Sequence, residues 1–120
     1  MVKIKVDDRE YGLRMDMYAM EMIEDEFGNM QDMFDKLKRG STKTVRILFR
    51  ILANAQLSLE GKEENITGDE LKHLSVGTIR TIAGAINRAI ELGMHSETTG
   101  GGSADDEVFD VYLNEIESKN

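Results

Sequence analysis

The chain contains no cysteine, no proline and no tryptophan. Without cysteine, a disulfide framework and cysteine-ligated metal sites are excluded. The two histidines, His73 and His95, stand apart in the sequence and lack the spacing of a zinc site. The absence of proline is typical of a helical protein with short connections. We therefore predict a mainly helical chain that carries no metal ion and no other cofactor.

Long hydrophobic runs are also absent. No apolar segment approaches the roughly 20 residues that a membrane-spanning helix needs. The first ten residues, MVKIKVDDRE, have charges where a signal peptide would carry its apolar stretch. These two absences predict a soluble protein of a reducing cytosol that does not interact with a membrane.

Aromatic residues make up only 6% of the chain, and apolar residues 40%. A length of 120 residues leaves room for one compact domain. Its core must be built from Leu, Ile, Val and Met, and it is expected to be thin. A thin core leaves apolar surface for burial against another molecule.

Positive charge is scarce: 15 basic residues face 23 acidic ones, for a net charge of −8. Such a balance repels a phosphate backbone, so nucleic acid is not an expected partner. Residues 96–120, the C-terminal segment, hold seven acids and one base, and thus −6 of the −8. A helical DNA-binding module is a poor interpretation, because Arg80 and Arg88 are the only bases between residues 76 and 92.

Alternating apolar and charged residues predict two strands, at 2–6 and 11–15, with a turn at Asp7-Asp8. Apolar residues at helical spacing follow, introduced by the N-cap candidates Asp16, Ser41 or Thr42, and Ser75. We expect helices at 17–27, 30–38, 42–55 and 76–92, a loop at 57–66, and a short helical turn at 67–73.

The C-terminal segment begins with a flexible linker by composition, residues 96–103, rich in Gly, Ser and Thr. Residues 104–120 have the spacing of an acidic amphipathic helix whose apolar face includes Val108, Phe109, Tyr112, Leu113 and Ile116. The predicted fold is α+β, mainly α: a small N-terminal β-hairpin packed on a bundle of four to five helices, with a linker-tethered C-terminal helix. Residues 1–95 form the globular domain of this prediction.

No motif proposes a catalytic site, and we predict that the chain is not an enzyme. Glu24, Asp25 and Glu26 resemble a general acid–base group, but on an amphipathic helix they form a solvated face. Gly100-Gly101-Gly102 lacks the preceding strand and the following Lys-Ser/Thr of a phosphate loop.

Three features are candidates for protein binding. Six of the eight methionines fall between residues 15 and 33, where they either fill the core or form an adaptable apolar surface. Lys43, Arg46 and Arg50, here called the basic strip, share one helix side and form either a solvated face or a docking strip for an acidic segment. The third is the C-terminal segment. We hypothesise that its acids meet the basic strip of a neighbouring copy while its apolar face is buried.

The order and wording of these elements resemble the tail assembly chaperones of long-tailed phages and prophages of Gram-positive bacteria. The resemblance covers nearly the whole chain and rests on four segments: DMYAMEMIEDEFGNM, RILFRILANAQLSLEGKEENIT, LSVGTIRTIAGAINRAIELGM and SETTGGGSADDEVFDVYLNEIE. Each segment is helical and apolar in character, so the resemblance supplies no catalytic residues to carry over.

The resemblance implies a protein of the bacterial host cytoplasm that binds the phage tape measure protein, keeps it soluble during tube assembly, and is absent from the mature virion. In many relatives a frameshifted longer form recruits the tail tube protein. A small, negatively charged helical protein suits this role, because exposed apolar helices of a long partner would otherwise aggregate. The competing interpretation is an acidic adaptor or inhibitor that binds one folded host protein at fixed stoichiometry.

Overall fold

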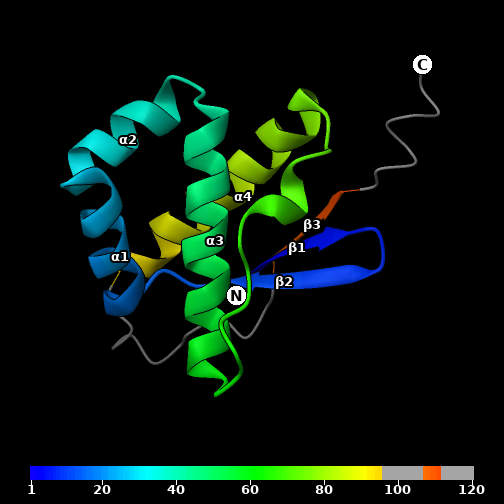
Figure 1. Cartoon of the computed structure of the whole chain (residues 1–120), viewed down its shortest axis with the longest axis horizontal. Coiled ribbons are helices and arrows are strands. Elements are labelled where there is room, and N and C mark those ends of the chain that lie inside the picture. Colours follow the sequence, from blue (N-terminus) through cyan, green and yellow to red (C-terminus); the bar gives the residue numbers. More distant parts are fainter. Residues whose placement is uncertain (96–106, 112–120) are drawn as a thin grey trace.

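The computed structural model describes residues 1–95 and 107–111, which form four α-helices, a short 3-10 helix and a three-stranded sheet (Figure 1). In chain order the elements are β1 (Val2–Val6), β2 (Arg9–Leu13), α1 (Met17–Phe27), α2 (Met30–Lys38), α3 (Thr42–Leu59), η1 (Asp69–Leu71), α4 (Val76–Gly93) and β3 (Glu107–Val111). This architecture confirms the predicted α+β, mainly α class. In the described part of the chain, no helix has the length and apolar character needed to cross a membrane.

The helix starts follow from local capping. Each N-cap side chain accepts a hydrogen bond from the backbone N–H three residues ahead: Asp16 from Ala19 at 2.9 Å, Ser41 from Thr44 at 3.1 Å, and Ser75 from Thr78 at 3.1 Å. These bonds satisfy amides that have no partner inside the helix. The predictions for Asp16 and Ser75 are confirmed, and Ser41 rather than Thr42 caps α3.

The predicted end of α3 at Ala55 is wrong, because the helix continues to Leu59. Residues 57–59 were expected in a loop, but no glycine or proline interrupts them. Leu57 packs against the core, and the Glu60 N–H donates to the Gln56 carbonyl at 3.1 Å. The chain turns away after the helix at Gly61, whose φ of +72° glycine adopts more readily than residues with a side chain.

The sheet has the strand order β2-β1-β3. β1 and β2 form the predicted hairpin, with Val2 opposite Leu13 and Val6 opposite Arg9. The predicted bounds of the second strand, 11–15, are wrong by two residues: β2 begins at Arg9, directly after the turn, and ends at Leu13, where the partner strand begins at Val2. β3 lies on the other side of β1 and runs parallel to it, with Ile4 opposite Phe109.

The predicted C-terminal helix is therefore wrong over residues 107–111, which form a strand. The segment Glu-Val-Phe-Asp-Val has two β-branched residues and an aromatic one, all of which favour strands. The free edge of β1 supplies the backbone partners that an isolated strand would lack. The predicted linker at 96–103 and the remainder of the predicted helix, 104–106 and 112–120, lie outside the described residues.

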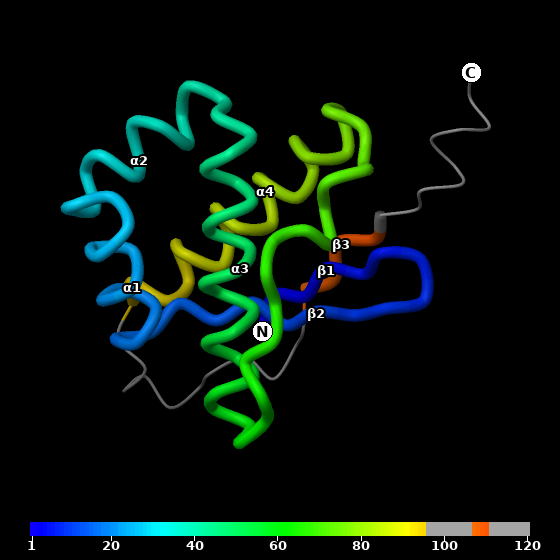
Figure 2. Tube along the Cα trace, in the orientation of Figure 1, coloured from blue at the N-terminus to red at the C-terminus, as the bar shows by residue number. Residues whose placement is uncertain are grey.

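The apolar face of the sheet packs against α3 and α4, which also pack against each other (Figure 2). Phe49 of α3 is fully buried, and its ring meets the edge of Tyr11 at a centroid distance of 5.2 Å. The core consists mainly of Ile, Leu, Val, Ala and Met side chains. α1 and α2 pack against α3 and each other, away from the sheet.

Candidate interaction surfaces

The residues considered from the sequence as catalytic groups or metal ligands lie apart on the surface. His73, His95, Glu24, Asp25 and Glu26 are all exposed. Within residues 1–95 and 107–111, no group of three or more His, Cys, Asp or Glu side chains is arranged to hold a metal ion. The functional candidates are therefore surfaces and clefts.

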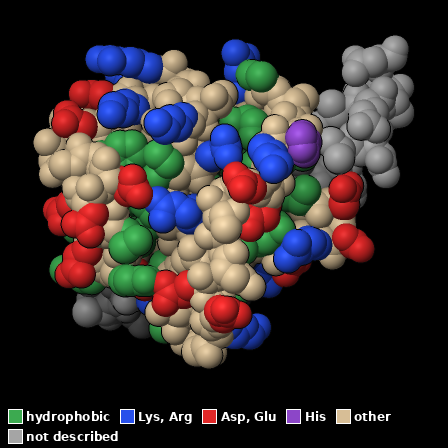
Figure 3. Space-filling view, in the orientation of Figure 1, with side chains coloured by type: hydrophobic (Ala, Val, Ile, Leu, Met, Phe, Trp, Pro, Cys, Tyr) green, Lys and Arg blue, Asp and Glu red, His purple; other side chains and the backbone are tan. Residues whose placement is uncertain are grey.

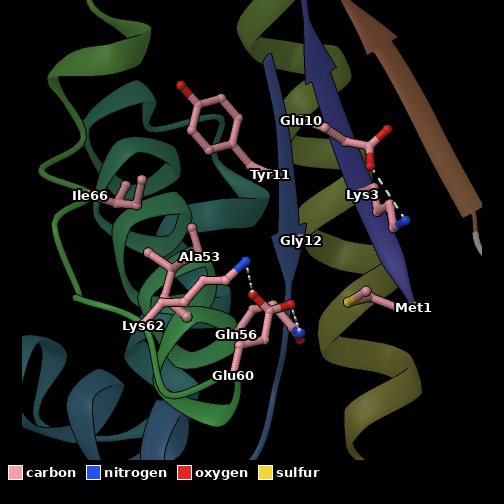
Figure 4. A pocket seen from close by; sticks show the side chains of 11 residues that line it. Met1, Lys3, Glu10, Tyr11, Gly12, Ala53, Gln56, Glu60, Lys62 and Ile66 are labelled. Atoms are coloured by element: carbon pink, nitrogen blue, oxygen red, sulfur yellow. Dashed lines mark hydrogen bonds and ion pairs between the residues drawn. The ribbon is translucent and has the colours of Figure 1, made fainter.

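A cleft of about 270 Å³ lies between the hairpin, α3 and the loop that follows α3 (Figure 4). Its charged side chains pair with one another: Lys3 with Glu10 at 3.4 Å, and Lys62 with Glu60 at 3.3 Å. Gln56 also donates to Glu60 at 2.8 Å, and this bond, with the contribution of Lys62, lowers the pKa of the Glu60 carboxyl. These charges are satisfied by the protein itself, so we assign no ligand to this cleft.

The basic strip is divided by the fold. Arg46 binds Asp69 at 3.0 Å and donates to the Gly68 carbonyl at 3.3 Å, so it ties α3 to η1. Arg50 binds Glu26 of α1 at 2.5 Å. Two of the three predicted docking residues thus already meet acids of their own domain. Lys43 is exposed and forms no ion pair with any described residue.

Lys43 instead belongs to a second basic feature, here called the basic cleft. This cleft has a volume of about 430 Å³ and lies where α1, α2 and α3 meet. It is lined by Glu26, Phe27, Lys36, Arg39, Ser41, Lys43, Thr44 and Ile47. Figure 3 shows Lys and Arg side chains grouped over α2 and the start of α3, and Asp and Glu side chains over α1.

The basic cleft was not predicted, although the sequence contains a signal for it. Residues 36–59 contain six Lys or Arg and no Asp or Glu, in a chain with a net charge of −8. The residues of the basic strip all lie on one helix, α3. The cations of the basic cleft come from two elements, α2 and α3, which are joined by the turn at Gly40. Only the packing of the two helices brings these cations together.

The methionines do not form one surface. Met33 is fully buried and Met15 is nearly so, whereas Met17 is 68% exposed. A different set gathers where β1, the start of α1 and the end of α4 meet, and we call it the methionine surface. Met1, Met15, Met17, Met20 and Leu92 line two hollows there, and the exposed Met94 belongs with them because it stands in the chain between Gly93 and His95, which line the same walls. Two hollows of about 240 and 270 Å³ open on this surface and share Met15 and Leu92 in their walls.

Gly93 makes this meeting of segments possible. A β-carbon at position 93 would lie 2.3 Å from the Met15 carbonyl oxygen, closer than any real contact of that kind. The end of α4 therefore approaches the chain between β2 and α1 more closely than any larger residue permits.

β3 is fixed to the domain by its first and third residues. The Arg88 guanidinium of α4 donates from Nε to both Glu107 carboxylate oxygens, at 2.9 and 3.1 Å, and also pairs with Glu91. The hydrogen bonds from Arg88 lower the pKa of Glu107, and those to Glu107 and Glu91 raise the pKa of Arg88. Phe109 packs against the core.

The predicted apolar face of the C-terminal segment is changed by this strand. Val108 and Phe109 were expected to share one helix face, but adjacent strand residues point to opposite sides. Val108 is 48% exposed, and Phe109 is partly buried. Tyr112, Leu113 and Ile116 lie outside the described residues.

The described surfaces offer two kinds of contact, a basic cleft with an apolar wall and a methionine-rich apolar surface. Both are suited to binding a protein segment. Comparison with protein-family models, with curated proteins and with solved structures finds no match to this chain.

Proposed function

We propose that this protein is a tail assembly chaperone of a long-tailed phage or prophage, which binds the tape measure protein and keeps it soluble while the tail tube assembles. Two independent arguments support the proposal. One is the resemblance of four sequence segments to that family. The other is the methionine surface, which is the structural observation in favour of the proposal.

The methionine surface has the exposure that a binding site for apolar helices needs. Met17, Met94 and Met1 are 68%, 52% and 41% exposed, and Leu92 is 39% exposed. Exposed apolar side chains that occur singly need no explanation, but a contiguous group around two hollows is typical of an interaction site. Flexible, polarisable methionine side chains adapt to partners of varied shape. A long tape measure protein presents such variety along its length.

The charge of the chain supports the same role. A net charge of −8 keeps a protein soluble after it has covered an apolar partner. Several copies bound to one long partner gain by avidity, so each contact can be weak and reversible. Reversibility is required, because the tube protein must replace the chaperone.

Co-expression with the tape measure protein encoded downstream tests this proposal. We expect the full chain to hold the tape measure in the soluble fraction and to co-purify with it in several copies. The variant Met17→Glu/Met94→Glu should lose this effect, because two carboxylates cannot be buried against an apolar helix.

The matched control is Leu59→Glu/Val76→Glu, which changes two apolar side chains that are each 59% exposed and that neither line the two hollows nor adjoin in the chain a residue that does. This control should keep the tape measure soluble. An insoluble tape measure in the presence of the unmodified chain and of any longer frameshifted form would overturn the proposal. Recovery of one folded host protein at fixed stoichiometry would replace it with the adaptor interpretation.

A further inference from the structure

We propose that the basic cleft is the docking site for residues 112–117 of a second copy of this chain, so that copies associate head to tail. This inference concerns self-association and does not depend on the tape measure protein. The fold of the described residues leaves the cations of this cleft without acidic partners.

The rim of the basic cleft is positive, and its charges are available. Lys36, Arg39 and Lys43 line it, and none of them forms an ion pair with a described residue. The Lys36 ammonium lies 5.5 Å from the centre of the Phe27 ring, which also lines the cleft, and this contact leaves its charge without a carboxylate partner among the described residues. The one carboxylate in the lining, Glu26, is already bound to Arg50.

The wall of the cleft is apolar. Phe27 and Ile47 are both partly buried and line the space of about 430 Å³. A ligand that fits must bring apolar side chains for this wall and negative charges for the rim. A small anion would leave the apolar wall uncovered, so a peptide segment with both properties fits better.

Residues 112–117, YLNEIE, have this combination. Tyr112, Leu113 and Ile116 supply apolar side chains, and Glu115 and Glu117 supply two carboxylates within three positions. The segment belongs to the part of the chain that carries −6 of the net −8. The charge of the segment is therefore opposite to that of the cleft.

The position of β3 favours docking on another copy. β3 runs parallel to β1, so the chain passes Val111 beside Val6 and the hairpin turn. In Figure 1 this end of β3 and the turn between α2 and α3 lie on different sides of the molecule. The pairing of Glu107 with Arg88 and the packing of Phe109 hold β3 there.

A contact between two different surfaces of identical chains is heterologous. Each copy offers one cleft and one segment, so association can continue from copy to copy. The expected signature is a mass that rises with protein concentration. Because the contact is largely electrostatic at its rim, the mass should fall at about 1 M salt, where charges are screened beyond about 3 Å.

The test is sedimentation velocity of the full chain from micromolar to millimolar concentration, at low and high salt. Lys36→Glu/Lys43→Glu reverses the cleft, and Glu115→Lys/Glu117→Lys reverses the segment. Each variant alone should weaken self-association by about tenfold or more, because two attractive contacts become repulsive. Lys72→Glu/Arg80→Glu is the matched control: it reverses two exposed cations outside the cleft and should associate as the unmodified chain does.

A mixture of the two reversed variants shows whether the segment docks on another copy or on the cleft of its own chain. Their charges are complementary only across molecules, so the mixture should recover association that neither variant shows alone. The proposal is overturned if the unmodified chain stays monomeric at low salt. It is also overturned if the control variant loses self-association to the same extent as the reversed variants, or if mixing the reversed variants restores no association. If only tape measure binding is lost in the cleft variant, the occupant is a partner's acidic segment and self-docking is wrong. The chaperone proposal has its own test at Met17 and Met94, so the two can fail independently.

Discussion

β1 has a neighbour on each side, and the two neighbours are held in different ways. β2 is joined to β1 by a short turn and buries Tyr11 and Leu13 in the core. β3 comes from the far end of the chain, and its Val108 is 48% exposed. The Arg88 and Glu107 side chains that fix it are 40% and 37% exposed. Because such ion pairs are screened by water, they contribute little to stability.

This contrast indicates two levels of stability within one sheet. The hairpin belongs to the unit that unfolds with the core, since its side chains are buried by α3 and α4. β3 depends on backbone pairing, one partly buried ring and an exposed ion pair. Strands with few buried side chains open locally, without global unfolding. β3 is thus expected to open without the rest of the sheet, whereas β2 is not.

The largest expected change in the free energy of unfolding comes from a substitution that affects the packing of β2. Phe49→Ala removes a fully buried ring that contacts Tyr11, and should destabilise the protein by about 3–5 kcal/mol. Urea unfolding followed by circular dichroism measures this change. Val108→Ala on β3 is the control and should change the free energy of unfolding by less than about 0.5 kcal/mol. Equal effects of the two substitutions would contradict the contrast between the strands.

A smaller effect is expected where α4 meets the chain after β2. Gly93→Ala places a β-carbon 2.3 Å from the Met15 carbonyl oxygen, so backbone must move, at a cost of about 1–3 kcal/mol. Gly84→Ala on the same helix is the control, because an added β-carbon there meets nothing within 4 Å. The control should stabilise the helix by about 0.5–1 kcal/mol. Thermal unfolding of both variants gives the comparison, and a neutral Gly93→Ala would show that the close approach does not matter.

The same contrast explains what could be predicted from the sequence. The hairpin, α1, α2 and α4 depend on contacts between near neighbours, such as the N-caps Asp16 and Ser75, and local patterns record them. β3 depends on a parallel partner at the other end of the chain, and no local pattern encodes that pairing. Helical spacing of Val108 and Tyr112 therefore suggested a helix, although Glu-Val-Phe-Asp-Val also suits a strand.

Binding surfaces were harder to predict for the same reason. Lys43, Arg46 and Arg50 share a helix side, as expected, but their partners come from other elements. Arg46 forms an ion pair with Asp69, and Arg50 forms one with Glu26. The packing of α2 against α3 brings Lys43 into the same cleft as Lys36. The sequence predicted which charges lie on one helix, whereas the tertiary fold determines which of them stay available.

Removal of the ion pair between Arg88 and Glu107 is expected to increase local opening of β3. Arg88→Gln keeps a polar side chain but removes the positive charge beside Glu107, and it should change global stability little, because the ion pair is exposed and screened by water. Hydrogen exchange at the amides of residues 107–111 should nevertheless become several-fold faster, while amides in α3 keep their rates. Faster exchange in α3 to the same extent would mean that β3 unfolds with the core and that the sheet has one level of stability.

The smallest expected effect is a dependence of β3 pairing on pH. Arg88 lowers the pKa of Glu107 below its ordinary value of 4.5 in the folded protein, and this interaction is absent when the chain is unfolded. A lowered folded-state pKa stabilises the protein above the unfolded-state pKa, and this contribution is lost as the pH falls through the folded-state pKa. β3 should therefore stay paired near neutral pH and loosen in the acid range below about pH 4.5. An acid titration followed by NMR at residues 107–111 should show a midpoint that moves upward in Arg88→Gln, because Glu107 then titrates closer to its ordinary value. A midpoint that the substitution leaves unchanged would mean that Arg88 does not control Glu107, and that backbone pairing and Phe109 alone hold the strand.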